Sequence, residues 1–328
     1  MPKIYGTLGP RCRDIQTLCD MFEAGMTGMR LNLSHITLHD AAEEIENLHR
    51  AAGKCGKRAD LLIDLQGPEL RIGALSQPLS LAAGQTVLLG AGGIPVPPLA
   101  LPFLVPGQEL LLDDGKLLLT VLESCAQSAR AQVLRGGTLE SRKSLALPGC
   151  ELHPPTLTEM DRENLSLAAS YDVTGVMQPF VRDRADLETV RTALNRFGGE
   201  NIRLFAKIEN REGVRNLDEL IPGCDEIVIA RGDLGSAMPL WELPRVQKEI
   251  SAKCRKADRA FMVVTQMLYT MERHAVPTRA EVSDIFNAVC DGAASVMVTG
   301  ETAVGDYPVE AIRYLARTAE EAERYLNK

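Results

Sequence analysis

The sequence predicts an α/β fold, a (β/α)₈ barrel of the TIM type with a small β-barrel-like domain inserted after its third strand. Eight short segments are apolar almost throughout, as parallel strands buried on both faces should be. Amphipathic segments lie between most of them, which favours strands joined by helical crossovers. One long interval lacks the helical pattern and predicts short antiparallel strands instead.

The eight expected barrel strands share a run of aliphatic residues that ends in polar ones. Two segments between them show the helical repeat clearly. In residues 182–199, Leu187, Val190 and Leu194 recur at helical spacing, and residues 244–259 have a similar pattern. The strands are expected at residues 3–9, 28–34, 60–66, 174–180, 203–209, 226–232, 260–266 and 295–301.

The inserted domain is expected at residues 73–148. Within it, residues 108–121 predict a hairpin that turns at Asp114–Gly115, and residues 130–137 predict a partner strand. The barrel would then consist of residues 1–72 and 149–328, about 250 residues and thus the usual length of such a barrel. No further C-terminal regulatory domain is expected.

Composition excludes several classes of function. The formal net charge of −8 argues against a nucleic acid or an anionic membrane surface as the main partner. The eight cysteines are scattered without a C-x-x-C pair, which favours reduced thiols in a cytoplasmic protein. The N-terminus lacks the apolar core of a signal peptide. Residues 86–107 are uncharged, but they contain five prolines and cannot form a membrane-spanning helix.

Polar side chains gather where the expected strands end. In barrels of this kind, chemistry takes place at the C-terminal ends of the strands. Such positions are Arg30, Asn32 and Ser34 on one face of the second strand, Asp64 on the third, Lys207 and Glu209 on the fifth, Asp233 after the sixth and Thr265 after the seventh.

These residue types suit a metal and an anionic ligand. Glu209 and Asp233 suit Mg²⁺, which takes one or two carboxylates and fills its other positions with water and substrate oxygens. A second site with oxygen ligands is offered by Asn32, Ser34 and Asp64, and a phosphate or carboxylate would suit Arg30, Arg71 and Lys207. With no obvious nucleophile, the set favours phosphoryl transfer or enolate chemistry.

A structural explanation exists for each residue taken singly. Arg30 with Asp64, or Lys207 with Glu209, would form ion pairs that close the barrel mouth, and Asp233 would cap a helix. The chain has no Walker A, dinucleotide-binding G-x-G-x-x-G or H-E-x-x-H motif, so any nucleotide must be held in another way.

Ten short motifs, in order along nearly the whole chain, resemble those of the pyruvate kinase family. They are TLGP (7–10), MRLNLSH (29–35), IDLQGPELR (63–71), LLDDG (111–115), LALPG (145–149), AKIENREGV (206–214), IARGDLG (229–235), TQML (265–268), PTRAEVSD (277–284) and GETAVGDYP (300–308). The resemblance implies transfer of a phosphoryl group from phosphoenolpyruvate to ADP, giving pyruvate and ATP. It also implies that the inserted domain acts as a lid.

The resemblance assigns a role to each candidate residue. Arg30 and Lys207 would flank the moving phosphoryl group, Gly232 and Asp233 would meet the substrate carboxylate, and Thr265 would line the face where the enolate carbon is protonated. Mg²⁺ (or Mn²⁺) would be held by Glu209 and Asp233. K⁺ would be held by Asn32, Ser34, Asp64 and the carbonyl of Leu65, and Glu69 is typical of members that need K⁺. The nucleotide phosphates would contact Asn32, His35, Arg71 and Lys143.

Several positions depart from the family pattern, and two alternative functions stay open. Gln66 and Val304 stand where lysine is usual, Val276 where arginine is common, Ile36 where glycine is usual, and Ala237 where glutamate is usual. The alternatives are a Mg²⁺-dependent lyase acting through a pyruvate enolate and a non-catalytic paralogue that binds phosphoenolpyruvate or a nucleotide. A homodimer formed through the barrel is expected in either case.

Overall fold

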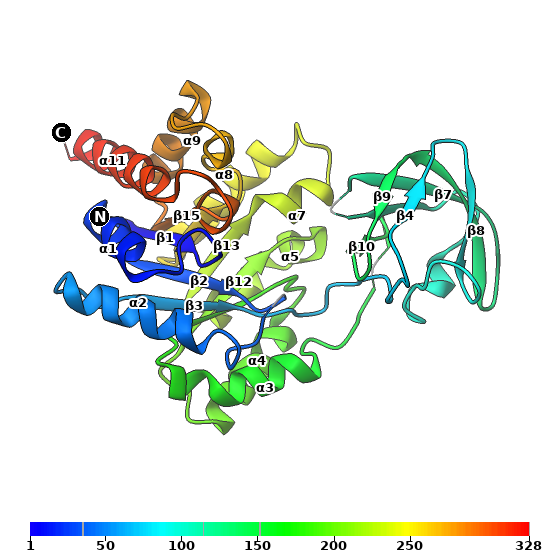
Figure 1. Cartoon of the computed structure of the whole chain (residues 1–328), viewed down its shortest axis with the longest axis horizontal. Helices are drawn as coiled ribbons and strands as arrows, with labels where there is room; N and C mark the ends of the chain where they lie inside the picture. The colour runs from blue at the N-terminus through cyan, green and yellow to red at the C-terminus, as the bar shows by residue number, and fades with distance from the viewer. Residues whose placement is uncertain (35, 114, 151, 328) are drawn as a thin grey trace. The chain divides into compact units, whose positions relative to one another are not determined.

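The computed structural model describes residues 1–34, 36–113, 115–150 and 152–327, and its larger unit is a closed barrel of eight parallel strands (Figure 1). The barrel prediction is confirmed, and each strand lies within its expected segment. Around the barrel the strands follow the order β1-β15-β14-β13-β12-β11-β3-β2. They are β1 (Lys3–Thr7), β2 (Gly28–Asn32), β3 (Asp60–Asp64), β11 (Gly175–Gln178), β12 (Arg203–Ile208), β13 (Glu226–Ala230), β14 (Ala260–Val264) and β15 (Ser295–Met297).

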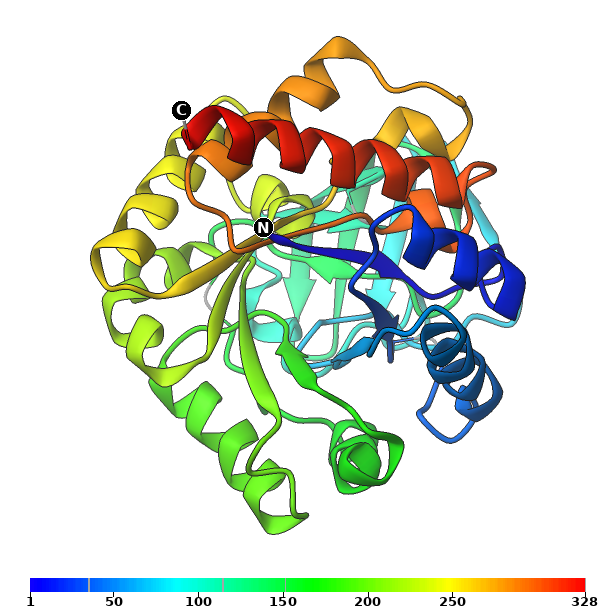
Figure 2. The same cartoon turned by 90° about the vertical axis from the view of Figure 1, so that its left-hand side faces the viewer.

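Helices surround these strands (Figure 2). Side-chain caps fix where several of them begin: Thr158 and Thr278 each form a capping box with the acidic residue three positions later. The helices are α1 (Ile15–Glu23), α2 (Ala42–Lys54), α3 (Glu159–Leu167), α4 (Arg184–Arg196), α5 (Arg211–Arg215), α6 (Leu217–Leu220), α7 (Arg231–Ser236), α8 (Leu243–Lys256), α9 (Arg279–Cys290), α10 (Gly300–Ala303) and α11 (Pro308–Leu326). Short 3₁₀ turns lie at Ala168–Tyr171, Ile221–Gly223 and Tyr269–Glu272. No helix among the described residues is both long and apolar enough to cross a membrane.

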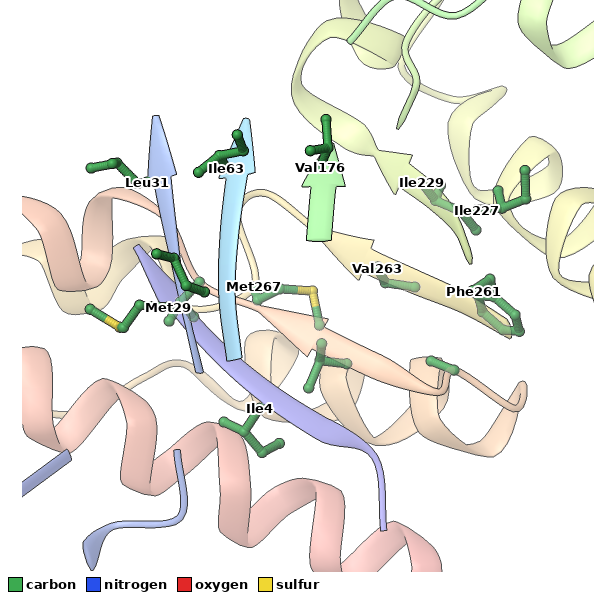
Figure 3. Packing of buried hydrophobic residues seen from close by; sticks show 14 of the residues in the cluster. Ile4, Met29, Leu31, Ile63, Val176, Ile227, Ile229, Phe261, Val263 and Met267 are labelled. Carbon is green, nitrogen blue, oxygen red and sulfur yellow. The ribbon is translucent and has the colours of Figure 1, made fainter. Parts of the chain in front are cut away.

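Alternation along the strands divides the barrel core into two layers. Residues such as Leu31, Ile63, Val176 and Ile229 pack between the strands and the helices (Figure 3). Their neighbours face the barrel interior, where the apolar layer consists of Tyr5, Leu62, Met177, Phe205, Val228, Ala230, Met262, Val264 and Met297. The same alternation places residues two positions beyond Leu62 and Phe205 at the mouth of that interior, and those residues are Asp64 and Lys207.

The second unit, Pro68–Pro155, consists of antiparallel strands in two sheets. The larger sheet has the order β10-β6-β7-β8-β5, and the smaller one pairs β4 with β9. The expected hairpin is β6 with β7, and the expected partner strand is β8. The bounds are β4 (Leu79–Leu81), β5 (Thr86–Gly90), β6 (Glu109–Leu112), β7 (Leu117–Cys125), β8 (Ser128–Arg135), β9 (Gly137–Leu139) and β10 (Leu145–Ala146), with a 3₁₀ turn at Leu101–Phe103.

This unit begins at Pro68 and ends at Pro155, so it extends beyond the expected range of 73–148 at both ends. The reason is local pairing. Arg71 forms an isolated β-bridge with Ser144, and the Ile72 backbone N–H donates to the carbonyl of Lys143 at 2.9 Å. The chain just before the expected boundary is thereby part of the β unit.

Asp161 fixes the places where the chain leaves and re-enters the barrel unit. Its carboxylate is fully buried and accepts hydrogen bonds from the backbone N–H groups of Gln66 (2.8 Å) and Gly67 (3.1 Å) on the outgoing side. On the returning side it accepts from the backbone N–H (2.9 Å) and the hydroxyl (2.8 Å) of Thr158.

Candidate active site

Two cations and two carboxylates form one connected cluster at the C-terminal ends of β2, β3 and β12. The Asp64 carboxylate accepts hydrogen bonds from Nε of Arg30 at 2.8 Å and from Nζ of Lys207 at 3.2 Å. Lys207 Nζ also lies 2.9 Å from Oε1 of Glu209. The sequence left open whether Lys207 and Glu209 bond each other, and the structure shows that they do. Lys207 is shared between Glu209 and Asp64, so neither carboxylate is its only partner.

The backbone supplies a further donor to this cluster. The second oxygen of Glu209 accepts a hydrogen bond from the backbone N–H of Phe180 at 2.8 Å. Phe180 has a positive φ of 51°, an uncommon conformation for a residue other than glycine. No local pattern predicts this contact, because it joins the loop after β11 to the residue that follows β12.

Neighbouring charges outweigh burial and set the charge states of Asp64 and Lys207. Burial alone would raise the pKa of Asp64, but Lys207 and Arg30 outweigh it and lower that pKa below its usual value. Burial alone would lower the pKa of Lys207, yet Asp64 and Glu209 outweigh it and raise the pKa, so the amine is protonated at neutral pH. These residues therefore present a fixed ammonium and a fixed carboxylate.

The pKa of Glu209 is raised, whereas that of the neighbouring carboxylate Asp64 is lowered. Burial raises the pKa of Glu209 to about 7, and repulsion from the carboxylates of Asp233 and Asp64 adds to the increase against the opposing effect of Lys207. Asp233 is near Glu209 in the fold, because it lies in α7 directly after β13, and β13 pairs with β12. Two carboxylates held close enough to repel each other suit a divalent cation between them.

Thr265 and Gly232 approach each other closely after the ends of the paired strands β14 and β13. A Cβ on Gly232 would lie 3.0 Å from the methyl group of Thr265, which is tighter than ordinary contact. Thr265 and the next residue, Gln266, both have positive φ, of 79° and 55°. A β-branched residue with positive φ is strained. Such strain persists only where the surrounding structure holds the backbone in place, and it is concentrated at functional sites.

Arg231 supports that strained turn. Its Nε and one terminal nitrogen donate to the carbonyl of Thr265 at 3.1 and 2.8 Å, and its other terminal nitrogen bonds Asp284 at 2.6 Å. Arg231 is thus a positioning residue whose role the sequence did not predict. Both Arg231 and Asp284 stand in recognisable motifs, but only the tertiary contact shows what they do.

Comparison with known proteins gives the same family. The family model described as "Pyruvate kinase, barrel domain" matches residues 1–92 and 99–312. Three relatives named pyruvate kinase each match 99% of this chain. They come from Bacillus licheniformis (35% identity), Chlamydia pneumoniae (36%) and Aeropyrum pernix (38%).

The chain belongs to the pyruvate kinase family. It spans 57% of the length of the B. licheniformis relative, 69% of that from C. pneumoniae and 71% of that from A. pernix.

Glu209 and Asp233 have the carboxylate chemistry that Mg²⁺ takes in proteins. Among the described residues, no three His, Cys, Asp or Glu side chains come together as ligands for a metal ion. A cation at Glu209 and Asp233 would therefore take two carboxylates from the protein and leave its other positions to water and substrate, as Mg²⁺ commonly does.

The other expected ligands lie partly together. Asn32 and Asp64 are directly opposite each other on paired strands, and Oδ1 of Asn32 accepts a hydrogen bond from the backbone N–H of Ser34 at 3.2 Å. Leu65 is buried directly after β3. These residues share one corner of the mouth, although the oxygens of Asp64 already accept from Arg30 and Lys207.

The expected nucleotide-side residues divide between the two units. Asn32 belongs to the barrel, whereas Arg71 and Lys143 belong to the β unit. Arg71 pairs with Glu69 at 2.5 Å, and Lys143 pairs with Asp113 at 3.2 Å. His35, the remaining candidate, lies outside the described residues.

Three departures from the family pattern lie at or near the surface. The side chains of Val276 and Val304 are exposed, and Gln66 is half-buried. None of the three belongs to the buried cluster of Arg30, Asp64, Lys207 and Glu209.

Proposed function

We propose that this chain is a phosphotransferase that moves the phosphoryl group of phosphoenolpyruvate to ADP, giving pyruvate and ATP. The observation that carries the proposal is the position of Lys207. Its side chain is only 12% exposed, and its ammonium lies 2.9 Å from Glu209 and 3.1 Å from Asp64 at the barrel mouth. Asp64 also binds Arg30, and Asp233 adds a carboxylate that repels Glu209.

Buried cations stabilise a transferring phosphoryl group more than exposed ones. In such a transfer the bond from phosphorus to the enol oxygen breaks while a bond to the terminal ADP oxygen forms, and negative charge spreads over the phosphoryl oxygens. Arg30 and Lys207 offset that charge in a site from which water is largely excluded. Asp64 keeps both cations in place, so they need no reorganisation when the phosphoryl group arrives.

Glu209 and Asp233 would hold Mg²⁺, or Mn²⁺ in its place. The bound metal ion would supply positive charge to the oxygens of the substrate. The backbone N–H groups of Gly232 and Asp233, in the first turn of α7, would also meet the substrate carboxylate. Because the pair repels without a cation, binding of the cation and ionisation of Glu209 favour each other.

Thr265 would line the face on which the enolate carbon receives its proton. Its close approach to Gly232 and its strained backbone, held by Arg231, favour a precisely placed hydroxyl there. K⁺ would be held by Asn32, Ser34, Asp64 and the carbonyl of Leu65. Arg71 and Lys143, with Asn32 and His35, would contact the nucleotide phosphates, with the β unit acting as a lid.

A coupled assay of pyruvate formation tests the proposal. We expect turnover with phosphoenolpyruvate, ADP and Mg²⁺, and a higher rate with K⁺ than with Na⁺. ADP, GDP and UDP should be compared, since the contacts to phosphate do not select the base. No pyruvate above background under any of these conditions would refute it, and calorimetric binding without turnover would support the non-catalytic alternative. Light scattering tests the proposed homodimer.

A further inference from the structure

Two cysteines that take no part in the proposed reaction lie side by side on the outside of the barrel unit. Cys19 is in α1, and Cys55 directly follows α2. Each thiol reaches the other's helix segment: Sγ of Cys19 lies 3.7 Å from the carbonyl oxygen of Ala51, and Sγ of Cys55 lies 3.8 Å from the carbonyl oxygen of Cys19. The same Ala51 carbonyl also accepts from the backbone N–H of Cys55 at 3.1 Å.

The Cys55 thiol also affects the ionisation of Cys19. Partial burial raises the pKa of Cys19, and a hydrogen bond and repulsion from the Cys55 thiol add to the increase, while Lys54 opposes it. The contact of each thiol with the backbone of the other segment places the two side chains next to each other. Both residues are half-buried, so a small molecule in solvent can reach them.

We propose that Cys19 and Cys55 form a reversible intramolecular disulfide when a peroxide oxidises the protein. One thiolate attacks the peroxide, which gives a sulfenic acid and releases water or an alcohol. The other thiol then attacks the sulfenic sulfur, forms the S–S bond and releases water. Two electrons leave the pair of thiols and reduce the peroxide, and a dithiol reductant reverses the change by thiol–disulfide exchange.

The surroundings allow the small movement that this bond requires. Sulfur atoms in a disulfide lie about 2.05 Å apart, so the two neighbouring thiols must move together for the bond to form. Cys55 has left the regular helix and lies between Gly53 and Gly56, around which a Cβ would meet open space. The segment after α2 can therefore shift without a clash.

A second pair of cysteines shows why this site is distinctive. Cys254 also affects the pKa of Cys224, but both are buried in the core, where burial raises the pKa of each thiol to about 12. A peroxide cannot reach them without local unfolding. Cys19 and Cys55 combine contact with partial exposure.

Mass spectrometry of the oxidised full-length chain tests the proposal directly. The reduced protein is treated with hydrogen peroxide at pH 8.5, its remaining thiols are alkylated, and it is digested with trypsin without reduction. We expect peptide 14–30 joined to peptide 55–57, and separation of the two after treatment with dithiothreitol. Sulfinic acids at these positions, alkylation of both thiols, or a cross-link between chains instead would overturn the proposal.

Stability provides a second measurement. The disulfide closes a loop of about 36 residues and should raise the melting temperature of the oxidised protein by roughly 5–10 °C. Cys55→Ser should remove both the linked peptide and this increase. Cys125→Ser, which removes an exposed thiol from the β unit, is the matched control and should retain both. An equal increase in Cys55→Ser would also contradict the proposal.

Discussion

Replacing each of two buried carboxylates by its amide should change the stability of the barrel in opposite directions. Asp64 and Glu209 are 1% and 3% exposed, and both contact Lys207. Their environments differ, because Asp64 lies between two cations whereas Glu209 faces another carboxylate, Asp233. We therefore expect Asp64→Asn to destabilise the protein and Glu209→Gln to stabilise it at pH 8.

The expected gain in folding stability for Glu209→Gln follows from the raised pKa of Glu209. A carboxyl group whose pKa rises from 4.5 to about 7 on folding is destabilised by roughly 3 kcal/mol when it is ionised. Between these pH values the folded state binds more protons than the unfolded state, so the wild-type protein loses stability as the pH rises. The advantage of Glu209→Gln should thus be largest at pH 8 and should shrink as the pH falls towards 4.5.

The change in folding stability caused by Asp64→Asn should have the opposite sign and a different pH dependence. Removing one member of a buried ion cluster typically costs about 3–5 kcal/mol, because the remaining charges lose their partner. Arg30 and Lys207 would be left with Glu209 alone. Since the folded pKa of Asp64 lies below its usual 3.8, its contribution is present above that pH and is lost only in stronger acid. The deficit should therefore persist from pH 5 to pH 8. It should be smaller at pH 8, because loss of Asp64 also removes a repulsion that raises the pKa of Glu209.

Calorimetric melting of the three proteins between pH 5 and pH 8 measures both effects. Saturating Mg²⁺ adds an internal check. It should raise the melting temperature of the wild type, by offsetting the repulsion between Glu209 and Asp233, and should have little effect on Glu209→Gln. If Glu209→Gln melts below the wild type at pH 8, the ion pair with Lys207 stabilises the fold more than burial and repulsion destabilise it. That result would refute the predicted sign.

Three further predictions concern turnover and acid stability. Lys207→Met should lower the rate of pyruvate formation by roughly 10³-fold or more while the protein stays folded by circular dichroism; near-normal turnover would mean that the role is misassigned. Gly232→Ala should press on Thr265 and lower kcat about tenfold, and an unchanged kcat in the coupled assay would place Thr265 away from the reacting atoms. Burial alone would raise the pKa of Asp186, but its bonds to Arg182 and a threonine lower it, so its stabilising effect is present at neutral pH and lost in acid. Asp186→Asn should therefore melt well below the wild type at pH 7 and much closer to it at pH 3, and an equal difference at both pH values would contradict this.

The sequence predicted the barrel and much of the candidate site because both depend on local periodicity. Strands buried on both faces are apolar throughout, and the alternation of side chains carries Lys207 and Glu209 to the same side of β12. The position of Asp64 at the end of β3 follows from the same rule.

Contacts between loops could not be predicted in this way. The backbone donor at Phe180 and the support of Thr265 by Arg231 each join segments that are far apart in the chain. Positive φ at Thr265 and Phe180 contradicts local preference, so it appears only when tertiary contacts impose it.

Charges at strand ends were also an incomplete guide. The N-terminal ends of the strands carry their own polar cluster, in which Asp60 accepts from Lys3, Tyr5 and Arg203. Polar residues at one end of a barrel therefore indicate a functional site only when their chemistry is also suitable.

The four hydrogen bonds to Asp161 have a consequence for how the two units are joined in the chain. One carboxylate holds the outgoing segment at Gln66 and Gly67 and the returning segment at Thr158. The barrel unit itself therefore holds together the two ends of the inserted segment, so the insertion is a loop that is already closed. Because the entropy of closing a loop grows only with the logarithm of its length, by about 0.6 kcal/mol for each doubling, the β unit can lengthen, shorten or be exchanged with little effect on the barrel. With Asp161 holding this junction, an inserted domain can be gained or replaced while the barrel that carries the candidate site keeps its fold.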